Sequence, residues 1–221
     1  MSESDNDRNR NMDVTSINDK SGVLSGLEHM SSVSLELGCG NRKQVKGAIG
    51  IDQFDHESVD IVGDVMAVLG QFPDQSVDSV HSFHFFEHVA DLQGLLKEVE
   101  RILKNGGNLE VVVPHFSSPY FYSDVTHRSF FGLYSFDYFV AKTLFSRKVP
   151  IYGEPLAFEM LRVDLVFKSP RPFYGRYAIK KLLGCLFNSC NYMRELYEEN
   201  FCYLFPCYEV RYQLRRIAEP S

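Results

Sequence analysis

The chain has 221 residues, of which 44% are apolar and 24% charged, and its formal net charge is −6 with an isoelectric point near 5.6. This length and balance are typical of one globular domain, and the acidic charge argues against a dedicated nucleic-acid-binding protein, which would carry a basic surface. No apolar run reaches the roughly 18 residues of a membrane-spanning helix, and the polar N-terminus does not resemble a signal peptide, so we expect a cytoplasmic protein.

Hydrophobic patterning predicts strands that alternate with helices after a polar start. Residues 1 to about 20 contain few large apolar side chains and are expected to form a flexible tail before a single domain over 21–221. The predicted elements are a short helix at 21–30, strands at 33–37, 48–51, 59–62, 77–83 and 109–113, an amphipathic helix at 89–103, a strand at 158–168, a helical stretch at 177–205 and a last strand at 209–216. Asn-Gly-Gly at 105–107 is expected to end the amphipathic helix. Such alternation builds a mostly parallel sheet with helices on both faces and ligands at the carboxyl ends of the strands.

The first predicted strand runs into Gly38-Cys39-Gly40, and the second ends on Asp52. The glycines leave room for a ligand near backbone N–H groups, and a carboxylate at the end of the second strand is well placed to accept hydrogen bonds from ribose hydroxyls. A dinucleotide-binding loop would carry a third glycine where Lys43 stands, and the connection to Asp52 is too short for a crossover helix. The loop therefore favours a cofactor with one ribose and no pyrophosphate. A nicotinamide-dependent oxidoreductase is the rival enzyme class.

Glu36-Leu37-Gly38-Cys39-Gly40 resembles the first motif of class I S-adenosylmethionine-dependent methyltransferases, and the segment at 50–52 resembles their second motif. The likeness continues through the segments at 63–65, 72–78, 86–89 and 98–107 and covers roughly residues 33 to 140, although Arg42 replaces a glycine that is often present in the first motif. This resemblance implies a Rossmann-like methyltransferase fold, with a mostly parallel seven-stranded sheet and an antiparallel C-terminal strand. It also implies S-adenosyl-L-methionine as the cofactor.

The same resemblance implies which residues bind the cofactor. Glu36 would help to hold the methionine ammonium group, while Asp64 and the N–H of Val65 would contact the adenine ring. Capping of a loop is the alternative role for Asp64. The predicted cofactor-binding residues are Glu36, Gly38, Cys39, Gly40, Asp52, Asp64, Val65 and Ser82.

Candidate catalytic residues follow the fourth and fifth predicted strands, whose carboxyl ends open on the same crevice. Methyl transfer to a hydroxyl requires alignment of the acceptor and removal of a proton, and a histidine suits the second task. His115 and His127 are the leading bases, with Asp124 orienting one imidazole and Arg128 binding an anionic or oxygen-rich acceptor. His84 completes the predicted catalytic set. For each of these residues, hydrogen bonding that pins a long loop to the sheet is the alternative.

Other polar residues of this region have a structural interpretation. Glu87 and His88 lie where the fourth strand gives way to a helix, and support of the fold is favoured over catalysis for this pair. Three histidines and an aspartate could bind a metal, but the His-x-x-x-His spacing of a helical site is missing, and the five cysteines lie mainly among apolar residues. We therefore expect no metal site, and we interpret the cysteines as core residues of a protein in a reducing compartment.

The segment at 114–139 resembles a subgroup of bacterial methyltransferases found beside surface-polysaccharide genes. Members carry Asp-Pro-Thr-His-Arg where this chain has Asp124-Val125-Thr126-His127-Arg128. The chain also lacks the Asp/Asn-Pro-Pro-Tyr signature of many amino-group methyltransferases after the fourth strand. These comparisons favour O-methylation of a sugar, a glycan or another small molecule, beneath a cover segment inserted at about 115–155. A non-catalytic methyltransferase-fold scaffold in glycan assembly is the alternative from a different class.

The C-terminal third contains a basic stretch. Between residues 168 and 194 there is no acidic residue, and the basic residues are Lys168, Arg171, Arg176, Lys180, Lys181 and Arg194, interspersed with leucine and phenylalanine. A basic amphipathic surface of this kind is consistent with peripheral contact with anionic lipid or a lipid-linked glycan. The more frequent alternative is a helix whose apolar side is core and whose lysines face water.

Overall fold

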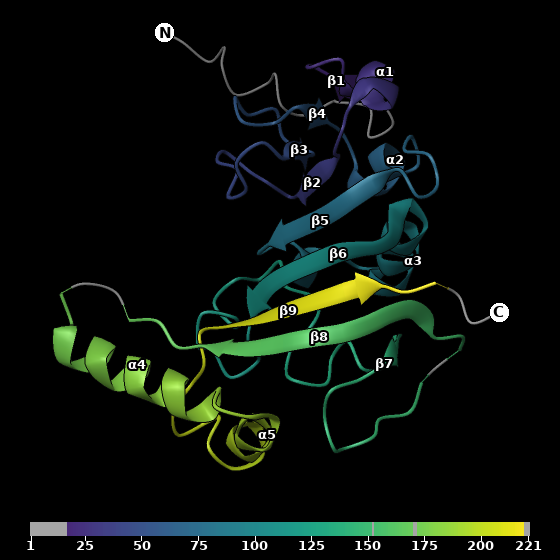
Figure 1. Cartoon of the computed structure of the whole chain (residues 1–221). Helices are drawn as coiled ribbons and strands as arrows, with labels where there is room; N and C mark the ends of the chain where they lie inside the picture. The colour runs from purple at the N-terminus through teal and green to yellow at the C-terminus, as the bar shows by residue number, and fades with distance from the viewer. Residues whose placement is uncertain (1–16, 152, 170–171, 219–221) are drawn as a thin grey trace, which may run out of the picture.

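The computed structural model describes residues 17–151, 153–169 and 172–218, and their strands form one nine-stranded sheet in the order β1-β4-β3-β2-β5-β6-β9-β8-β7 (Figure 1). The elements are β1 (Asn18–Asp19), α1 (Val23–Gly26), η1 (Leu27–His29), β2 (Ser34–Leu37), β3 (Ile49–Asp52), β4 (Ile61–Val62), α2 (Val65–Leu69), β5 (Val77–Phe83), η2 (Phe86–His88), α3 (Leu92–Ile102), β6 (Leu103–Pro114), β7 (Val140–Lys142), β8 (Leu156–Val166), α4 (Tyr174–Phe187), α5 (Asn191–Asn200) and β9 (Glu209–Arg216). The predicted Rossmann-like sheet, mostly parallel with an antiparallel C-terminal strand, is confirmed. Within the described residues it has nine strands rather than seven, because the edge strands β1 and β7 are too short to show a hydrophobic period.

The strand order places a ligand-binding edge beside β2 and β5. Strands β4, β3, β2, β5 and β6 are parallel neighbours, and β9 runs antiparallel between β6 and β8. The chain builds outward from β2 in one direction and from β5 in the other, so the carboxyl ends of these two strands flank a topological switch point, where such sheets bind ligands. In Figure 1 the arrowheads of β5, β6 and β8 point toward the side on which α4 projects.

Most predicted elements are present, and β5 and β9 have the predicted bounds. Of the predicted tail, residues 1–16 lie outside the described part of the chain. Asn18–Asp19 pairs with β4, and the carboxylate of Asp19 accepts hydrogen bonds from the N–H groups of Val23 and Leu24 at the start of α1, so the predicted tail extends too far. The amphipathic helix ends at Ile102, and the Asn-Gly-Gly sequence lies inside β6, at a register shift against β5, rather than at the helix end.

The helices pack in pairs beside the sheet. Helix α2 contacts α3, which buries Leu95, Leu96, Val99 and Ile102, while α4 contacts α5 and β8. In the part of the chain that the structure describes, no helix has both the length and the apolar character needed to cross a membrane.

The segment at 115–155 connects β6 to β8 and contains turns and the edge strand β7, with no helix among its described residues. A bridge pairs His115 with Phe131, so the segment folds back onto the carboxyl end of β6. Its aromatic residues divide into two groups. Phe121 and Phe131 are buried, whereas Tyr120 and Phe130 are exposed.

Candidate active site

The turn after β2 depends on its two glycines. Gly38 and Gly40 have φ angles of 65° and 57°, a left-handed conformation that residues with side chains rarely adopt. A Cβ atom on Gly38 would lie 2.6 Å from the side chain of Phe85. The N–H groups of Gly38 and of the next residue donate to a carbonyl of β3, and the N–H of Gly40 donates to the carboxylate of Asp52 at 2.8 Å. We expected these N–H groups to approach a ligand. They fasten the turn to β3 instead, because the short connection to that strand holds the two elements together.

Asp52 ends β3 on the wall of a cavity of about 970 Å³, which we call the glycine cavity. Its carboxylate accepts the N–H of Gly40 and, at 2.9 Å, that of Phe54. Each oxygen retains capacity for a second hydrogen bond, so the carboxylate can still accept from neighbouring hydroxyls of a ligand. The lining of the glycine cavity includes Gly38, Asp52, Phe54, Val65, His84, Phe85, His88 and Arg128.

Glu36 is almost completely buried and is held by the loop that follows the glycine turn. Its two oxygens accept the N–H of Gln44 at 2.8 and 2.9 Å, and one also accepts the N–H of Val45 at 2.8 Å. Residues 41–48 form no helix, so this loop occupies the place of a crossover helix, as the short connection predicts. The carboxylate predicted to hold the methionine ammonium group therefore already binds two backbone N–H groups and does not line the glycine cavity.

The remaining predicted cofactor residues lie around the glycine cavity rather than on its wall, apart from Val65. Asp64 caps α2 by accepting the N–H of Ala67 at 3.0 Å, which matches the alternative role given to it. Ser82 is fully buried. Burial, followed by the charge of Asp52, raises the pKa of the Cys39 thiol to about 12, so this cysteine stays protonated at neutral pH.

His84 follows β5 and is held between two carboxylates. It has a φ of 57°, which is unusual for a residue with a side chain and is often found at functional sites. Its Nε2 atom lies 2.9 Å from Glu209 and its Nδ1 atom lies 3.4 Å from Glu87. Both contacts raise the pKa of His84, to about 9, and the hydrogen bond with Glu209 has the larger effect. His84 is therefore an imidazolium ion at neutral pH and is not a general base in this arrangement.

Asp124, Thr126 and His88 form a chain of hydrogen bonds across the mouth of the site. The hydroxyl and the N–H of Thr126 both donate to Asp124, at 2.6 and 2.9 Å, and these bonds lower the pKa of the Asp124 carboxyl. The Nδ1 atom of His88 lies 2.9 Å from the same hydroxyl. Because the hydroxyl proton is engaged by Asp124, His88 donates from Nδ1, and the neutral form of the ring then has its lone pair on Nε2.

His127 has the same arrangement of ring nitrogens. Its Nδ1 atom lies 2.8 Å from the carbonyl oxygen of Phe121, which can only accept, so Nδ1 carries the proton and Nε2 carries the lone pair. Its Nε2 atom is 3.7 Å from Asp124, so Asp124 holds His88 through Thr126 more closely than it holds His127. The ring of His127 lies 4.8 Å from that of His88, centroid to centroid.

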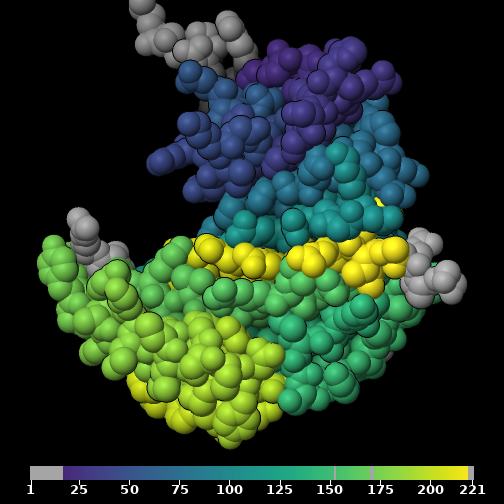
Figure 2. All heavy atoms as spheres, viewed as in Figure 1, coloured from purple at the N-terminus to yellow at the C-terminus, as the bar shows by residue number. Residues whose placement is uncertain are grey.

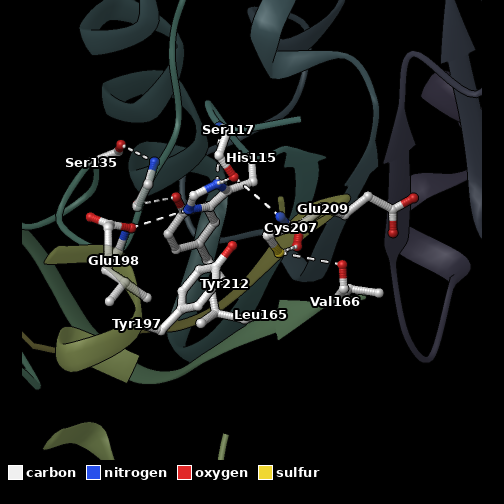
Figure 3. A network of polar contacts seen from close by, with 12 residues as sticks. His115, Ser117, Ser135, Leu165, Val166, Tyr197, Glu198, Cys207, Glu209 and Tyr212 are labelled. Atoms are coloured by element: carbon white, nitrogen blue, oxygen red, sulfur yellow. Dashed lines mark hydrogen bonds and ion pairs between the residues drawn. The ribbon is translucent and has the colours of Figure 1, made fainter. Parts of the chain in front are cut away.

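His115 lies away from these histidines, in a closed network that Figure 3 shows from close by. It is fully buried; its Nδ1 atom accepts the N–H of Ser117 at 3.1 Å, so Nε2 carries the proton and donates to Glu198 at 3.2 Å. The carboxylate of Glu198 also accepts the N–H of Leu133, and the hydroxyl of Ser117 accepts the N–H of Cys207. Because side chains alternate along a strand, His115 faces away from the crevice that its neighbour Pro114 lines. This position does not support the predicted role of His115 as a base. It matches the alternative, a residue that pins loops to the sheet.

Two further cavities continue from the glycine cavity, the first beside it and the second beside the first. The histidine cavity, of about 220 Å³, is lined by His84, Glu87, His88, Pro114, Ser118, Tyr120, Asp124, His127 and Tyr208. It shares His84 and His88 with the glycine cavity. The basic cavity, of about 490 Å³, shares Ser118, Tyr120 and Tyr208 with the histidine cavity and adds Lys168, Arg176 and Lys180. Figure 2 shows this side of the molecule hollowed between the N-terminal part, coloured blue, and α4, coloured light green.

Arg128 lines the glycine cavity and not the histidine cavity, so it faces the predicted cofactor side rather than the predicted acceptor side. Its N–H and that of Ser129 donate to the carbonyl of Glu87, at 2.7 and 3.2 Å. These bonds fix the loop at 124–128 against η2 and bring His127 beside His88.

Several residues of the site escaped the sequence analysis. Glu209 starts β9, is 3% exposed, and binds both His84 and Lys168. Its only sequence signal is an acidic residue at the start of a strand whose other charged residues are all arginines. The contacts of Glu87 and Thr126 with the site depend on elements far apart in the chain, which no local pattern reports.

Comparison with known proteins supports the predicted class. The family model described as "Methyltransferase domain" matches residues 35–111, which run from β2 to β6. Together with the methyltransferase fold, this match supports an S-adenosylmethionine-dependent methyltransferase with S-adenosylmethionine as its cofactor. No curated protein matches the chain.

Among solved structures, a SAM-dependent methyltransferase from Archaeoglobus fulgidus is 17% identical, with a TM-score of 0.50 over 88% of this chain and 93% of that one. Phosphoethanolamine N-methyltransferase 2 from Haemonchus contortus, in complex with S-adenosyl-L-methionine, is 12% identical, with a TM-score of 0.48 over 90% of this chain and 52% of that one. At this identity, the likeness to the first of these structures establishes the fold alone.

Proposed function

We propose that this protein transfers the methyl group of S-adenosylmethionine to a hydroxyl oxygen of a sugar, a glycan or another small acceptor. The cofactor would lie in the glycine cavity, with its ribose on Asp52, and the acceptor in the histidine cavity. The single observation that carries this proposal is the shared wall of the two cavities, where His88 belongs to both and His127 lies beside it with a lone pair on Nε2.

The chemistry of this reaction needs little beyond alignment and proton removal. The bond between the sulfonium and its methyl carbon breaks as the new carbon–oxygen bond forms, S-adenosylhomocysteine is released, and the hydroxyl passes its proton to Nε2 of His127. Activation of the hydroxyl at His127 agrees with the role predicted from the sequence. The positive charge of His84 lies at the junction of both cavities and would favour an oxygen that carries partial negative charge.

The basic cavity favours an acceptor that carries an anionic group. Lys168 is engaged by both oxygens of Glu209, at 2.6 Å each. Within the described residues no ion pair is formed by Arg176 or Lys180, so these two cations are available to a phosphate or carboxylate. The shared residues Tyr120 and Tyr208 would let a long acceptor extend from the histidine cavity into the basic cavity. A phosphate-bearing glycan of surface-polysaccharide biosynthesis, methylated in the cytoplasm, satisfies these features.

Helix α4 supports the predicted contact with anionic lipid or a lipid-linked glycan. Ile179 and Leu182 are 60% and 70% exposed, so much of its apolar side is not core, contrary to the alternative interpretation. Lys180 and Lys181 lie between these two residues in the chain. Exposed apolar and basic side chains on one helix are typical of peripheral membrane binding. We expect the protein to co-sediment with vesicles of phosphatidylglycerol but not of phosphatidylcholine, and a Lys180→Glu/Lys181→Glu variant to lose this binding. Equal binding by that variant would contradict the contact.

Two measurements test the proposed function. Isothermal titration should show binding of S-adenosylmethionine and none of NAD, which also tests the rival oxidoreductase. Mass spectrometry of cell-envelope glycans should show one more methyl group in cells that contain the protein than in cells that lack it. Cells that contain only the His127→Gln variant should lack this methyl group. If that variant restores the methyl group fully, the catalytic assignment fails. If no glycan changes while the protein still supports glycan assembly, the scaffold alternative is favoured.

A further inference from the structure

Glu87, His88 and His127 bring three potential metal ligands together on the wall of the histidine cavity. One ligand atom from each residue lies within 4.8 Å of the corresponding atoms of the other two. Glu87 and His88 come from η2, while His127 comes from a loop some 40 positions further along the chain. The spacing of histidines along the chain predicts no metal site, because the His-x-x-x-His pattern of a helical site is missing. Here the third ligand is supplied by a separate loop that is bound to the Glu87 carbonyl.

The carboxylate of Glu87 lacks hydrogen-bond partners. The residue is 0% exposed, and neither of its oxygens accepts a hydrogen bond from any described residue. Its nearest cation is His84, at 3.4 Å from one oxygen, but His84 is held more closely by Glu209 at 2.9 Å. A buried carboxylate whose one close cation is shared with another carboxylate is costly, and a bound metal ion is one of the arrangements that removes this cost.

The two histidines are prepared as ligands. Metal-binding histidines usually donate the N–H of the other ring nitrogen to a carbonyl or, directly or through an intermediate group, to a carboxylate. His127 donates Nδ1–H to the Phe121 carbonyl, and His88 donates Nδ1–H to Thr126, which donates to Asp124. Both rings therefore have their tautomer fixed, with the Nε2 lone pair free.

We propose that Glu87, His88 and His127 bind a divalent transition-metal ion of the Zn²⁺ type on the wall of the histidine cavity. Two imidazoles and one carboxylate suit such an ion better than Mg²⁺, which prefers oxygen ligands. Three protein ligands leave at least one coordination position, and the adjoining cavity gives an acceptor oxygen access to it.

This inference deepens the proposed function in one respect, and the following step rests on that function. An acceptor hydroxyl bound to the ion would release its proton to water near neutral pH, because the cation stabilises the alkoxide. The alkoxide oxygen would then take the methyl carbon as the sulfonium bond breaks. With the ion bound, Nε2 of His127 would be a ligand rather than the base, and water would take the hydroxyl proton.

The test is a titration with Zn²⁺ alone. The full-length protein is first treated with a chelator. We expect one tight equivalent of Zn²⁺. Glu87→Gln and His127→Gln should each weaken binding at least 10-fold, and Thr126→Val, which removes the hydroxyl that links His88 to Asp124, should weaken it about 10-fold. His81→Gln is the matched control, because His81 also pairs with a carboxylate, Glu110 at 3.1 Å, but lies outside the cavity. Circular dichroism checks that each variant is folded. Because His127→Gln alters a residue of the cavity wall, the test does not depend on replacement of the buried Glu87 alone.

The possible outcomes are distinct. Absence of a tight equivalent, or binding that Glu87→Gln and His127→Gln leave unchanged, overturns the metal site. If no metal binds but methyl transfer proceeds in the presence of a chelator, the proposed function stands and the metal site fails. If Zn²⁺ binds as expected but the protein methylates no glycan, the metal site stands and the proposed function fails.

Discussion

Two clusters of histidine and carboxylate lie near the carboxyl end of β6, and they differ in how completely their polar atoms are paired. In the His115 cluster both ring nitrogens and the Glu198 carboxylate have partners inside the protein (Figure 3). In the cluster of Glu87, His88 and His127, the carboxylate has no well-formed hydrogen bond, and Nε2 of His127 lies 3.7 Å from Asp124, too far for a hydrogen bond. A closed network stabilises the fold, whereas an open one beside a cavity is prepared for a ligand.

Asp137 shows that an unpaired carboxylate does not by itself make a site. It is 1% exposed and its oxygens have no hydrogen-bond partner among the described residues, as in Glu87. Burial raises the pKa of Asp137 to about 7, and its electrostatic neighbours are Lys148 and Glu195 rather than imidazoles. Asp137 can therefore relieve its burial by keeping its proton. The imidazoles, and not the burial alone, distinguish Glu87.

The largest effect is expected for His127→Gln, in the cluster of Glu87, His88 and His127. We predict that methyl transfer falls at least about 100-fold, because loss of the group that activates the hydroxyl removes this much or more. Binding of S-adenosylmethionine should change less than about twofold, since His127 does not line the glycine cavity. Initial rates and calorimetry on the purified protein measure both quantities. A large loss of cofactor affinity with an unchanged rate would contradict the division between the two cavities.

The corresponding substitution in the His115 cluster is His115→Leu. Removing the imidazole deprives the mostly buried Glu198 carboxylate of the Nε2–H donor of His115. The free energy of unfolding should therefore fall by about 3 kcal/mol. For a chain of this size the melting temperature should drop by roughly 10 °C. The rate of methyl transfer per folded molecule should stay within about threefold of the wild type. Loss of activity in a fully folded variant would contradict this prediction and would support a catalytic role for His115.

Asp137 predicts a pH dependence of stability. Because the pKa of this carboxyl is raised from 3.8 in the unfolded chain to about 7, the unfolded state loses its proton at lower pH than the folded state does. Stability contributed by this group is therefore lost as the pH rises from about 4 to 7 and beyond, by about 2 kcal/mol between pH 5 and pH 8. Urea unfolding of Asp137→Asn across this range should show a smaller decline than that of the wild type. Parallel curves for the two proteins would exclude Asp137 as the cause.

The smallest effect is expected for Gly38→Ala. A side chain at a φ of 65° costs about 1 to 2 kcal/mol, and the new Cβ would displace Phe85 from the wall of the glycine cavity. We predict modest destabilisation and about tenfold weaker binding of S-adenosylmethionine, measured by thermal unfolding and calorimetry. Gly26→Ala is a suitable control, because a Cβ there meets no atom within 4 Å. Equal effects of the two changes would argue against a special role for Gly38.

The sequence predicts the sheet better than it predicts the site. β9 alternates apolar and polar residues over most of its length, so its bounds could be predicted, and the left-handed glycines after β2 could be anticipated from residue type. His115 and His127 have similar sequence surroundings, and only strand alternation and the fold of the loop separate their roles. The partners of Glu36 and His84, in the loop at 44–45 and at the start of β9, depend on tertiary contacts that no local pattern contains.

The most direct test of the account is a crystal structure of the protein with S-adenosylhomocysteine. We predict that both ribose hydroxyls bind the Asp52 carboxylate and that the thioether sulfur faces the wall formed by His88 and His127. A complex in which the ribose lies away from Asp52, or in which the sulfur faces away from these two histidines, would contradict the proposal that methyl transfer takes place where the two cavities meet.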